Sequence, residues 1–418
     1  MSTSKKELDL EGSPGEKYVA DTGVGYSENA VHKYEFAAGD SVYAKLQRIA
    51  GKYGVEQRGI ERVPSDERDD TNMSKIGTIW LSANLVVSSF AIGALSIPIF
   101  GLGFVDSALT IIFINLLGIL PVCFFSTFGP RFGLRQMVLS RFYFGYYGVK
   151  VIAIFNILAC IGWSSVNVIV GAQLFHAINT DMPGWAGIVV IAVLTMVICM
   201  FGYKIVHVYE RWSWIPCLVI FLIVLGEFAH TGKFNNLLPL ATGPAEAGAI
   251  LSFAAGVYGF ATGWVSYAAD YTVYQPVDRS RKSVFLWTFG GLFLPLVFTE
   301  LLGAAVMTAT INDEDYLNAY FDSGIGGLFA VVLVPPLGRF GEFCMAILAL
   351  SITANNCPNI YSVSLSLQVL SQKPSAYRGS SGPLSARVRM WLSPSPATTD
   401  SRSGSRLMLI IGYWLAIY

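Results

Sequence analysis

Charged side chains are scarce in this sequence. Asp, Glu, Lys and Arg make up 13% of its 418 residues, against about 25% in soluble domains, and 53% of the residues are hydrophobic. The 28 Lys and Arg balance the 28 Asp and Glu, so the chain lacks the basic excess that attracts nucleic acid. With a mean hydropathy of +0.53, this composition excludes an ordinary soluble domain and favours a chain embedded in a lipid bilayer.

Metal-ligand spacing and a partnered catalytic nucleophile are also missing. The six cysteines fall inside apolar runs and are interpreted as small core residues: Cys123, Cys160, Cys199, Cys217, Cys344 and Cys357. The four histidines are too scattered to bind a metal together: His32, His176, His207 and His230. We therefore predict no metal site, no cofactor and no enzyme activity. No apolar run resembling a cleavable signal peptide opens the chain.

Long apolar segments are abundant instead. A helix needs roughly 20 apolar residues to cross about 30 Å of hydrocarbon. Eight segments meet this requirement: 77–99, 107–128, 149–176, 184–202, 212–230, 247–269, 283–309 and 341–369. The sequence therefore predicts an all-α, polytopic membrane protein whose core of eight spans covers residues 77–370.

The loops between these spans differ in charge, which predicts the orientation. Lys and Arg gather after the second, fourth and sixth spans: Arg131, Arg135, Arg141, Lys150, Lys204, Arg211, Arg279, Arg281 and Lys282. The loops after the first and third spans carry no Lys or Arg, the loop after the fifth carries only Lys233, and the loop after the seventh span is acidic. Because basic loops are retained in the cytoplasm, the N-terminus is predicted to be cytoplasmic.

Polar segments flank the membrane core. Residues 1–76 are interpreted as a cytoplasmic tail in which 41–60 have the periodicity of a short surface helix. Residues 371–406 are rich in Ser, Pro and Arg and cannot cross a bilayer. The apolar run 407–418 has only 12 residues, about 18 Å of helix, and is therefore a partial span.

Small residues interrupt the first and sixth spans, as in transporters whose broken helices expose backbone at a midplane site. The first span contains the run SSFAIGA at 88–94, and the sixth contains Gly256, Gly259 and Gly263. The alternative is that these residues only permit close helix packing. The positions of the two segments predict a fold of five plus five spans related by an inverted repeat.

Aromatic and amide side chains occur at unusual depth. Trp163 and Asn167 share one face of the third span, where they suggest a stacking plate beside a hydrogen-bonding arm. The eighth span places three carboxamides around a proline: Asn355, Asn356, Pro358 and Asn359. Carboxamides match the donor and acceptor edge of a flat heteroaromatic ring, whereas helix-to-helix amide pairing is the structural alternative.

Several motifs together resemble the fungal purine-cytosine permeases of the nucleobase-cation symport family. They are VPSDERDDTNMSKIGTIWLSAN, GPRFGLRQMVLSRF, NILACIGWSSVN, ATGWVSYAADYTVY and ANNCPNIYS. The resemblance covers roughly residues 40–370. It implies multi-pass insertion in the plasma membrane and uptake of cytosine, adenine, guanine and hypoxanthine by alternating access, coupled to a proton or to sodium.

The resemblance also assigns roles to residues. It implies that Trp163 and Trp264 sandwich the base, that Asn167 and Asn359 bind its edge, and that Pro358 and Ser89 shape and line the site. Asn355 and Asn356 join them as neighbouring carboxamides. The candidates for proton coupling are the acids within or beside the spans, for which a structural ion pair is the alternative: Glu300, Asp270 and Glu210.

The C-terminal part departs from the family pattern. The polar segment 371–406 replaces the ninth span, and 407–418 resembles part of the tenth, so we expect the second repeat to be incomplete. One alternative is therefore a truncated product that does not transport. A second is a uracil, allantoin or thiamine-type permease of the same superfamily.

Overall fold

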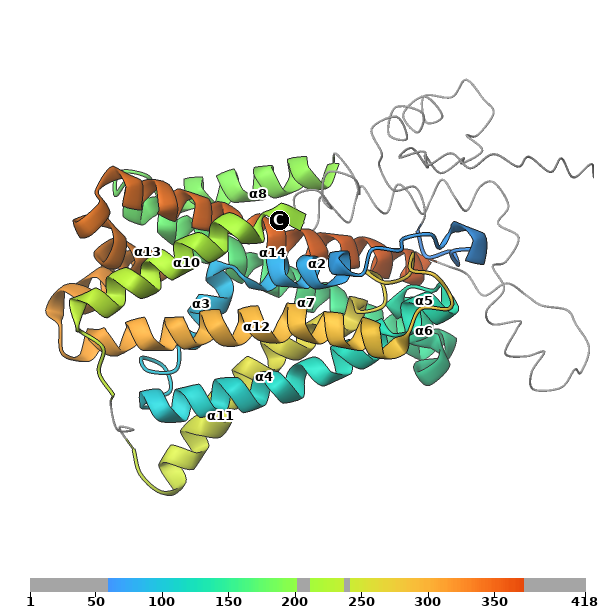
Figure 1. Cartoon of the computed structure of the whole chain (residues 1–418), viewed down its shortest axis with the longest axis horizontal. Helices are drawn as coiled ribbons and strands as arrows, with labels where there is room; N and C mark the ends of the chain where they lie inside the picture. The colour runs from blue at the N-terminus through green and yellow to red at the C-terminus, as the bar shows by residue number, and fades with distance from the viewer. Residues whose placement is uncertain (1–58, 201–210, 237–240, 372–418) are drawn as a thin grey trace, which may run out of the picture. The chain divides into compact units, whose positions relative to one another are not determined.

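The computed structural model describes residues 59–200, 211–236 and 241–371, which all belong to one compact unit, Phe36–Tyr418. Every regular element within these ranges is a helix, which confirms the all-α class (Figure 1). Nearly all of the predicted surface helix at 41–60 and of the segments 371–406 and 407–418 lies outside the described residues.

Helices occupy all eight predicted spans. They are α2 (Ser74–Asn84) with α3 (Val87–Ala94), α4 (Phe104–Ser126), α7 (Arg141–Ile178), α8 (Gly184–Met200), α10 (Trp214–Thr231), α11 (Pro244–Thr262) with the 3-10 helix η2 (Gly263–Tyr267), α12 (Arg281–Met307) and α14 (Arg339–Ser371). Short helices precede or follow the spans: η1 (Ser65–Glu67) lies before α2, and α5 (Phe128–Phe132), α6 (Gln136–Leu139) and η3 (Thr308–Ile311) lie between later helices. Seven of the described helices, or eight counting the bent pair α2 and α3, are long and apolar enough to cross a membrane. They include α13 (Glu314–Leu337), which the sequence predicts to be a loop, and they exclude the shorter α8.

The first span is broken, as predicted. Helices α2 and α3 meet at 54°, and the extended backbone of Val86 separates them. The break leaves carbonyl groups without helical partners, and side chains take them up. The Ser89 hydroxyl donates to the Asn84 carbonyl (2.6 Å), and Asn355 Nδ2 on α14 donates to the Ala83 carbonyl (2.6 Å). The sixth span changes from α-helix to 3-10 helix at Gly263.

The acidic loop expected after the seventh span is instead a helix, α13 (Glu314–Leu337). Asp313 caps its first turn by accepting from two backbone amides, and Lys233 at the end of α10 forms an ion pair with Asp313 (2.5 Å). This ion pair lowers the pKa of the Asp313 carboxyl. Non-helical backbone at Ser323 and Gly324 divides α13 into two pieces. Each piece is shorter than the about 20 residues that a single straight span needs. Helix α13 packs mainly against α7 and α14.

The central helices of the bundle are α12 and α14. In their most apolar stretches 67% and 78% of the residues are buried, against 28% in α7, α10 and α11, whose remaining faces are free to contact lipid. Three aromatic rings pack between helices beside the broken first span: Phe90 lies 4.5 Å from Phe329 and 6.4 Å from Phe221, measured between ring centroids. This packing fixes the position of α3, which forms one wall of the site described below.

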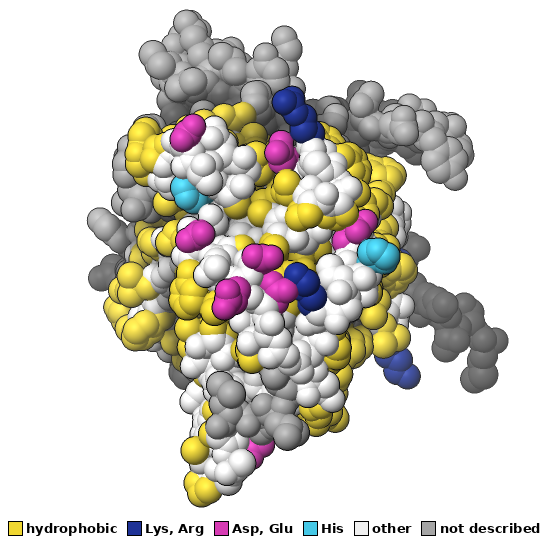
Figure 2. Space-filling model, turned by 90° about the vertical axis from the view of Figure 1, so that its left-hand side faces the viewer, with side chains coloured by type: hydrophobic (Ala, Val, Ile, Leu, Met, Phe, Trp, Pro, Cys, Tyr) yellow, Lys and Arg dark blue, Asp and Glu magenta, His cyan; other side chains and the backbone are white. Residues whose placement is uncertain are grey.

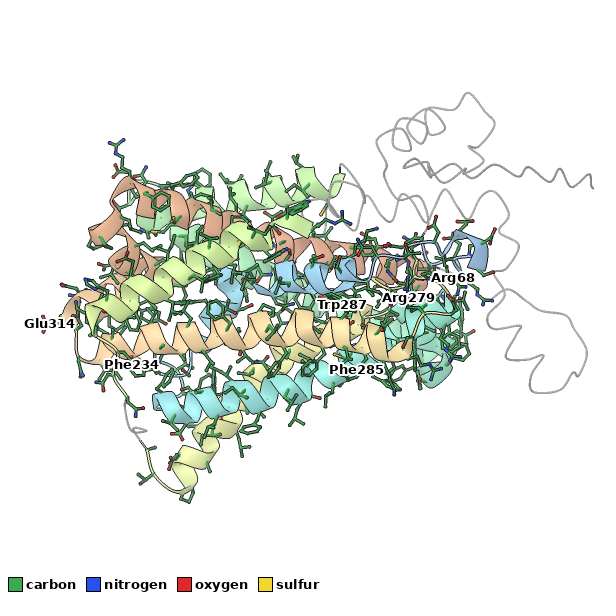
Figure 3. The ribbon with its side chains drawn as sticks, in the orientation of Figure 1. Arg68, Phe234, Arg279, Phe285, Trp287 and Glu314 are labelled. Carbon is green, nitrogen blue, oxygen red and sulfur yellow. The ribbon has the colours of Figure 1, made fainter. Side chains whose placement is uncertain are left out.

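An extended strap, defined as residues 59–72, lies across one end of the helices. Its backbone pairs with Gly133 and Tyr274, and the buried Arg68 donates to the Pro130 carbonyl (2.8 Å). Arg68 and Arg279 lie at this strap end, and Glu314 lies at the opposite end, which carries α13 (Figure 3). Figure 2 faces the α13 end, where acidic side chains are more numerous than Lys and Arg.

Candidate functional site

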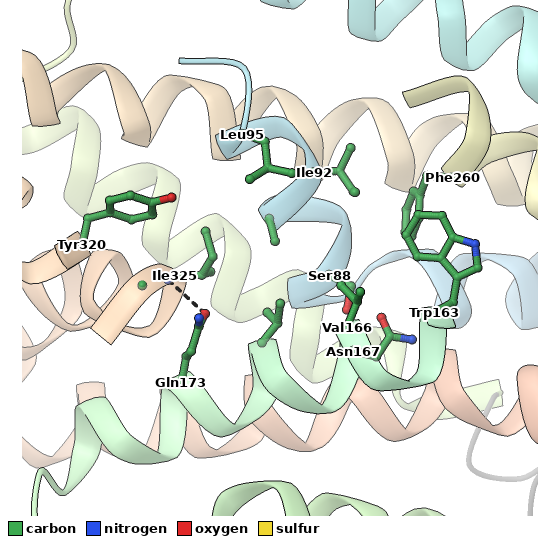
Figure 4. Close-up of a pocket in the computed structure, with 13 residues that line it drawn as sticks. Ser88, Ile92, Leu95, Trp163, Val166, Asn167, Gln173, Phe260, Tyr320 and Ile325 are labelled. Carbon is green, nitrogen blue, oxygen red and sulfur yellow. Dashed lines mark hydrogen bonds between the residues drawn. The ribbon is translucent and has the colours of Figure 1, made fainter. Parts of the chain in front are cut away.

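A cavity of about 180 Å³ lies between α3, α7, α11 and α13. The broken first span supplies one wall through Ser88 and Ile92, and α7 supplies the facing wall through Trp163 and Asn167 (Figure 4). The remaining lining residues are Ala91, Leu95, Val166, Val170, Gln173, Phe260, Tyr320, Gly324 and Ile325. Most of this lining is apolar, and a few polar groups are placed to orient a small ligand.

Three carboxamides meet behind the α7 wall. Asn167 is fully buried, and its Nδ2 donates to Asn355 Oδ1 (2.6 Å) and to Asn356 Oδ1 (2.8 Å). Asn355 in turn holds the carbonyl of Ala83 at the break of the first span. The structure therefore brings three of the predicted site residues together and connects them to the broken helix, although only Asn167 lines the cavity.

This network fixes the orientation of the Asn167 amide. Both N–H groups of its Nδ2 are directed at amide oxygens, so a reversed amide would set oxygen against oxygen. Its Oδ1 is buried and has no hydrogen-bond partner in the described part of the protein. An unpaired buried acceptor is costly, and here it belongs to a residue that faces a cavity. Asn167 can therefore accept a hydrogen bond from a ligand.

The aromatic end of the cavity consists of Trp163 and Phe260. Their ring centroids are 5.2 Å apart with planes inclined at 61°. Trp264, the second plate implied by the family resemblance, does not line the cavity in this structure. It is buried in η2 and packs edge-on against Trp80 and Tyr267, at centroid distances of 5.6 and 5.5 Å. The aromatic residue across from Trp163 is therefore Phe260, one turn before Trp264.

Three other predicted residues lie beside the cavity rather than in it. Ser89 turns back to the Asn84 carbonyl, and its neighbour Ser88 faces the cavity instead. Pro358 is buried within α14. Asn359 accepts a hydrogen bond from the Tyr267 hydroxyl (3.0 Å) and keeps a buried Nδ2 that has no partner among the described residues. Asn359 therefore retains one donor group close to η2.

The candidate acids differ in their surroundings. Asp270 accepts from the Gln136 amide (2.7 Å), and its own carbonyl accepts from Arg135 (3.0 Å), so it ties two loops together at the strap end. Glu300 is completely buried in α12, where Asn115 on α4 donates to it (2.7 Å). Glu210 lies outside the described residues.

Sequence reasoning missed several lining residues, among them Ser88, Phe260, Gln173 and Tyr320. Gln173 could have been found, because it continues the helical face of Trp163, Asn167 and Val170. Its Oε1 accepts from the Ile325 amide (3.2 Å), directly after the break in α13. Tyr320 carried no such signal, because it lies in the segment interpreted as a loop.

Known proteins are similar to this chain in sequence and in fold. Residues 62–373 match the sequence model of the family described as permease for cytosine/purines, uracil, thiamine and allantoin. The chain belongs to this family. Within it, the chain is 57% identical to the purine-cytosine permease fcyB of Emericella nidulans, over 88% of this chain and 71% of that protein. It is 41% identical to the purine-cytosine permease FCY2 of Saccharomyces cerevisiae, over 78% of this chain and 62% of that protein. This permease is therefore a fungal-type purine-cytosine permease by sequence, and it matches just under two thirds of the length of the yeast relative.

Solved structures show the same fold at low identity. The chain is similar to Mhp1, a nucleobase-cation-symport-1 family transporter in a closed conformation with bromovinylhydantoin bound, with a TM-score of 0.62 and 13% identity. That match covers 87% of this chain and 75% of Mhp1. A Na⁺-coupled sialic acid symporter is also similar, with a TM-score of 0.56, 15% identity, and coverage of 90% and 79%. The permease thus has a transporter fold, and its inverted repeat remains a prediction.

Proposed function

We propose that this permease carries purines and cytosine across the plasma membrane by alternating access, coupled to a proton. The observation that carries the proposal is the cavity itself, in which the aromatic end formed by Trp163 and Phe260 lies near the unpaired acceptor of Asn167. A flat ring stacks on an aromatic side chain with about 1–3 kcal/mol per base. The names of the two fungal relatives support these substrates.

The acceptor at Asn167 fits the polar edge of the proposed substrates. Cytosine, adenine and guanine each carry an amino group, and hypoxanthine carries ring N–H groups, so each can donate to Asn167 Oδ1. Asn359 Nδ2 would supply a donor to the ring if the site extends toward η2. Trp264, Pro358 and Ser89 would then hold the lining residues in place without contacting the base themselves.

The charge distribution supports a cytoplasmic strap end. Helix ends and loops rich in Lys and Arg lie there, whereas α13 and its acids lie at the other end (Figures 2 and 3). Tyr320, Gly324 and Ile325 of α13 line the cavity, so α13 would cover the route from outside. In this arrangement the base enters past α13 and leaves past the strap.

Uptake by cells that lack other nucleobase carriers tests the proposal. Labelled cytosine should accumulate when the full chain is produced, and excess adenine, guanine or hypoxanthine should block its entry, whereas uracil, allantoin and thiamine should not. Inhibition by uracil alone would instead favour a uracil-type permease. No uptake by a chain that reaches the plasma membrane would favour the truncated, inactive product.

Variants of the buried amides test the position of the substrate site in the same uptake assay. Asn167→Ala and Asn359→Ala should each abolish cytosine uptake while the protein stays at the membrane, because each removes a buried hydrogen-bonding group. Asn318→Ala is the matched control, because Asn318 is exposed on α13. Unchanged uptake by the Asn167 variant would contradict the assignment of the cavity as the substrate site.

A further inference from the structure

A buried acid lies directly behind the cavity wall. Glu300 on α12 has no exposed surface, and among the described residues its side chain has one hydrogen bond, from Asn115 Nδ2 to Glu300 Oε2. Asn115 is equally buried, and its Nδ2 also donates to the Ile111 carbonyl of its own helix (2.9 Å). The Glu300–Asn115 pair joins α12 to α4 inside the bundle. Neither residue lines the cavity.

No described cation balances Glu300. Helix α12 packs against α2, α3, α4, α10 and η3, and neither α3 nor η3 carries an ionisable side chain. The ionisable side chains on the other three helices make no hydrogen bond or ion pair with Glu300: Lys75, Asp106, Cys123, Cys217, Glu227 and His230. A carboxylate buried in hydrocarbon without a cation is strongly unfavourable, so the neutral acid is the stable form here.

Two unpaired oxygens belong to this pair. Glu300 Oε1 and Asn115 Oδ1 are both buried, and neither has a hydrogen-bond partner within the described ranges. Glu300 Oε1 shares its carbon with the Oε2 that accepts the existing hydrogen bond, and Asn115 Oδ1 shares its carbon with the Nδ2 that donates it. Rotation of the two planar groups about their side-chain bonds can therefore bring the two free oxygens to face each other. Two acceptors cannot pair with each other, but a proton on Oε1 makes it a donor to Oδ1. One proton therefore satisfies both oxygens and gives a cyclic acid–amide pair.

We propose that the Glu300–Asn115 pair is the proton-binding site of this permease. This inference takes the identity of the substrate from the proposed function. The burial of the Glu300–Asn115 pair does not depend on which molecule the cavity binds. Binding consists of one proton joining the Glu300 carboxylate to give the neutral acid, and release is the reverse. No other reactant is required.

Close packing connects the pair to the cavity through α3. Gly93 on α3 lies against the backbone carbonyl of Glu300, and Gly303 on α12 lies against the carbonyl of Phe90, so that a methyl group at either glycine would overlap the facing backbone. The opposite face of α3 presents Ser88, Ala91 and Ile92 to the cavity. The neutral pair thus holds α12 and α4 together behind the helix that contacts the substrate. Loss of the proton would leave a charge that favours water entry and separation of these helices.

Coupling between proton and substrate follows from this geometry. If the neutral pair stabilises the cavity, then proton binding strengthens cytosine binding, and cytosine binding strengthens proton binding by the same factor. Raising the pH should therefore weaken cytosine binding to the wild-type protein. Glu300→Gln imitates the neutral acid and keeps an amide–amide pair with Asn115, so it should bind cytosine with an affinity that no longer changes with pH.

Infrared spectroscopy of the purified full chain in lipid nanodiscs tests the site without reference to the substrate. The wild-type protein should show a carbonyl band of a protonated carboxylic acid that Glu300→Gln lacks and Asn115→Leu shifts. Glu314→Gln is the matched control, since Glu314 is exposed at the start of α13 (Figure 3). If Glu300→Gln retains the band, or if the wild-type protein has none, the proposal is overturned, whether or not cytosine binds.

Cytosine binding to the same samples, measured across pH, tests the coupling. We expect at least a tenfold loss of affinity between acid and alkaline pH for the wild-type protein and for Glu314→Gln, and a constant affinity for Glu300→Gln. Equal pH dependence in the wild-type protein and Glu300→Gln would place the coupling proton elsewhere. Absence of cytosine binding by the wild-type protein would refute the proposed substrate, and the infrared result would still decide the proton site.

Discussion

The indole of Trp163 is the largest flat surface in the cavity, and it belongs to a long helix that is anchored behind it by the Asn167 amide network. We expect Trp163→Ala to weaken cytosine binding by about 5- to 150-fold, which corresponds to the loss of about 1–3 kcal/mol of stacking. Trp163→Phe should retain most of the affinity, because it keeps an aromatic face.

Calorimetric titration of the purified variants measures this effect. Trp185→Ala is the control, since Trp185 on α8 is 69% exposed and does not line the cavity. A Trp163→Ala variant with wild-type affinity would show that the base does not stack on this side chain.

At the residue scale, the sequence predicted that amides of α7 and α14 gather, but not that Asn167 pairs with Asn355 and Asn356 while Asn359 contacts Tyr267. It also did not predict which aromatic rings face the cavity. Periodicity placed Trp163 and Asn167 on one helical face of α7, and both line the cavity. Trp264 could not be placed in this way. The chain changes from α-helix to 3-10 helix at Gly263, and this change in rotation per residue directs Trp264 to Trp80 and leaves Phe260 facing the cavity.

At the scale of helices, the packing of α12 depends on glycine at particular contacts. A methyl group at Gly303 would overlap the Phe90 carbonyl, whereas one at Gly290 in the same helix meets no atom within 4 Å. We expect Gly303→Ala to destabilise the permease by about 1–3 kcal/mol, because the backbones of α3 and α12 must move apart. Gly290→Ala should be neutral or stabilising by up to about 1 kcal/mol, because alanine is the better helix former.

Unfolding of the two purified variants in the same detergent, followed by the exposure of buried cysteines, compares them directly. The six cysteines are all buried, so their reaction with a thiol probe reports unfolding. Equal stability of the Gly303 and Gly290 variants would mean that α3 and α12 are not held at the observed distance.

Helix prediction succeeded where apolar runs are continuous and failed at α13. Two features concealed that helix: the acids clustered in its first half and the Pro335–Pro336 pair near its end. Its apolar half, which begins at Ile325, is too short to resemble a span. Its helical state depends on tertiary contacts with α7 and α14, which a local pattern does not contain. The broken first span was predictable because small residues and the depth of the break are both visible in the sequence.

At the scale of the whole permease, the proposed orientation rests on the Lys and Arg that gather at the strap end. Arg135 is fully buried there and donates to backbone carbonyls of Gly59 and Asp270, while Arg279 donates to the Thr71 carbonyl. Basic side chains at this end thus have a structural role in addition to any role in insertion. An orientation derived from the count of Lys and Arg alone therefore requires an independent test.

Cysteine labelling in intact cells provides that test. We expect Glu314→Cys, at the exposed start of α13, to react with a membrane-impermeant maleimide added outside, because α13 is proposed to face the exterior. Ser65→Cys, which is exposed on the strap, should react only after the cells are permeabilised. The native protein is the control and should give little signal, since its six cysteines are buried. Labelling of Ser65→Cys in intact cells would show that the strap faces outside. In that case α13 would cover the cytoplasmic route to the cavity instead of the outer one.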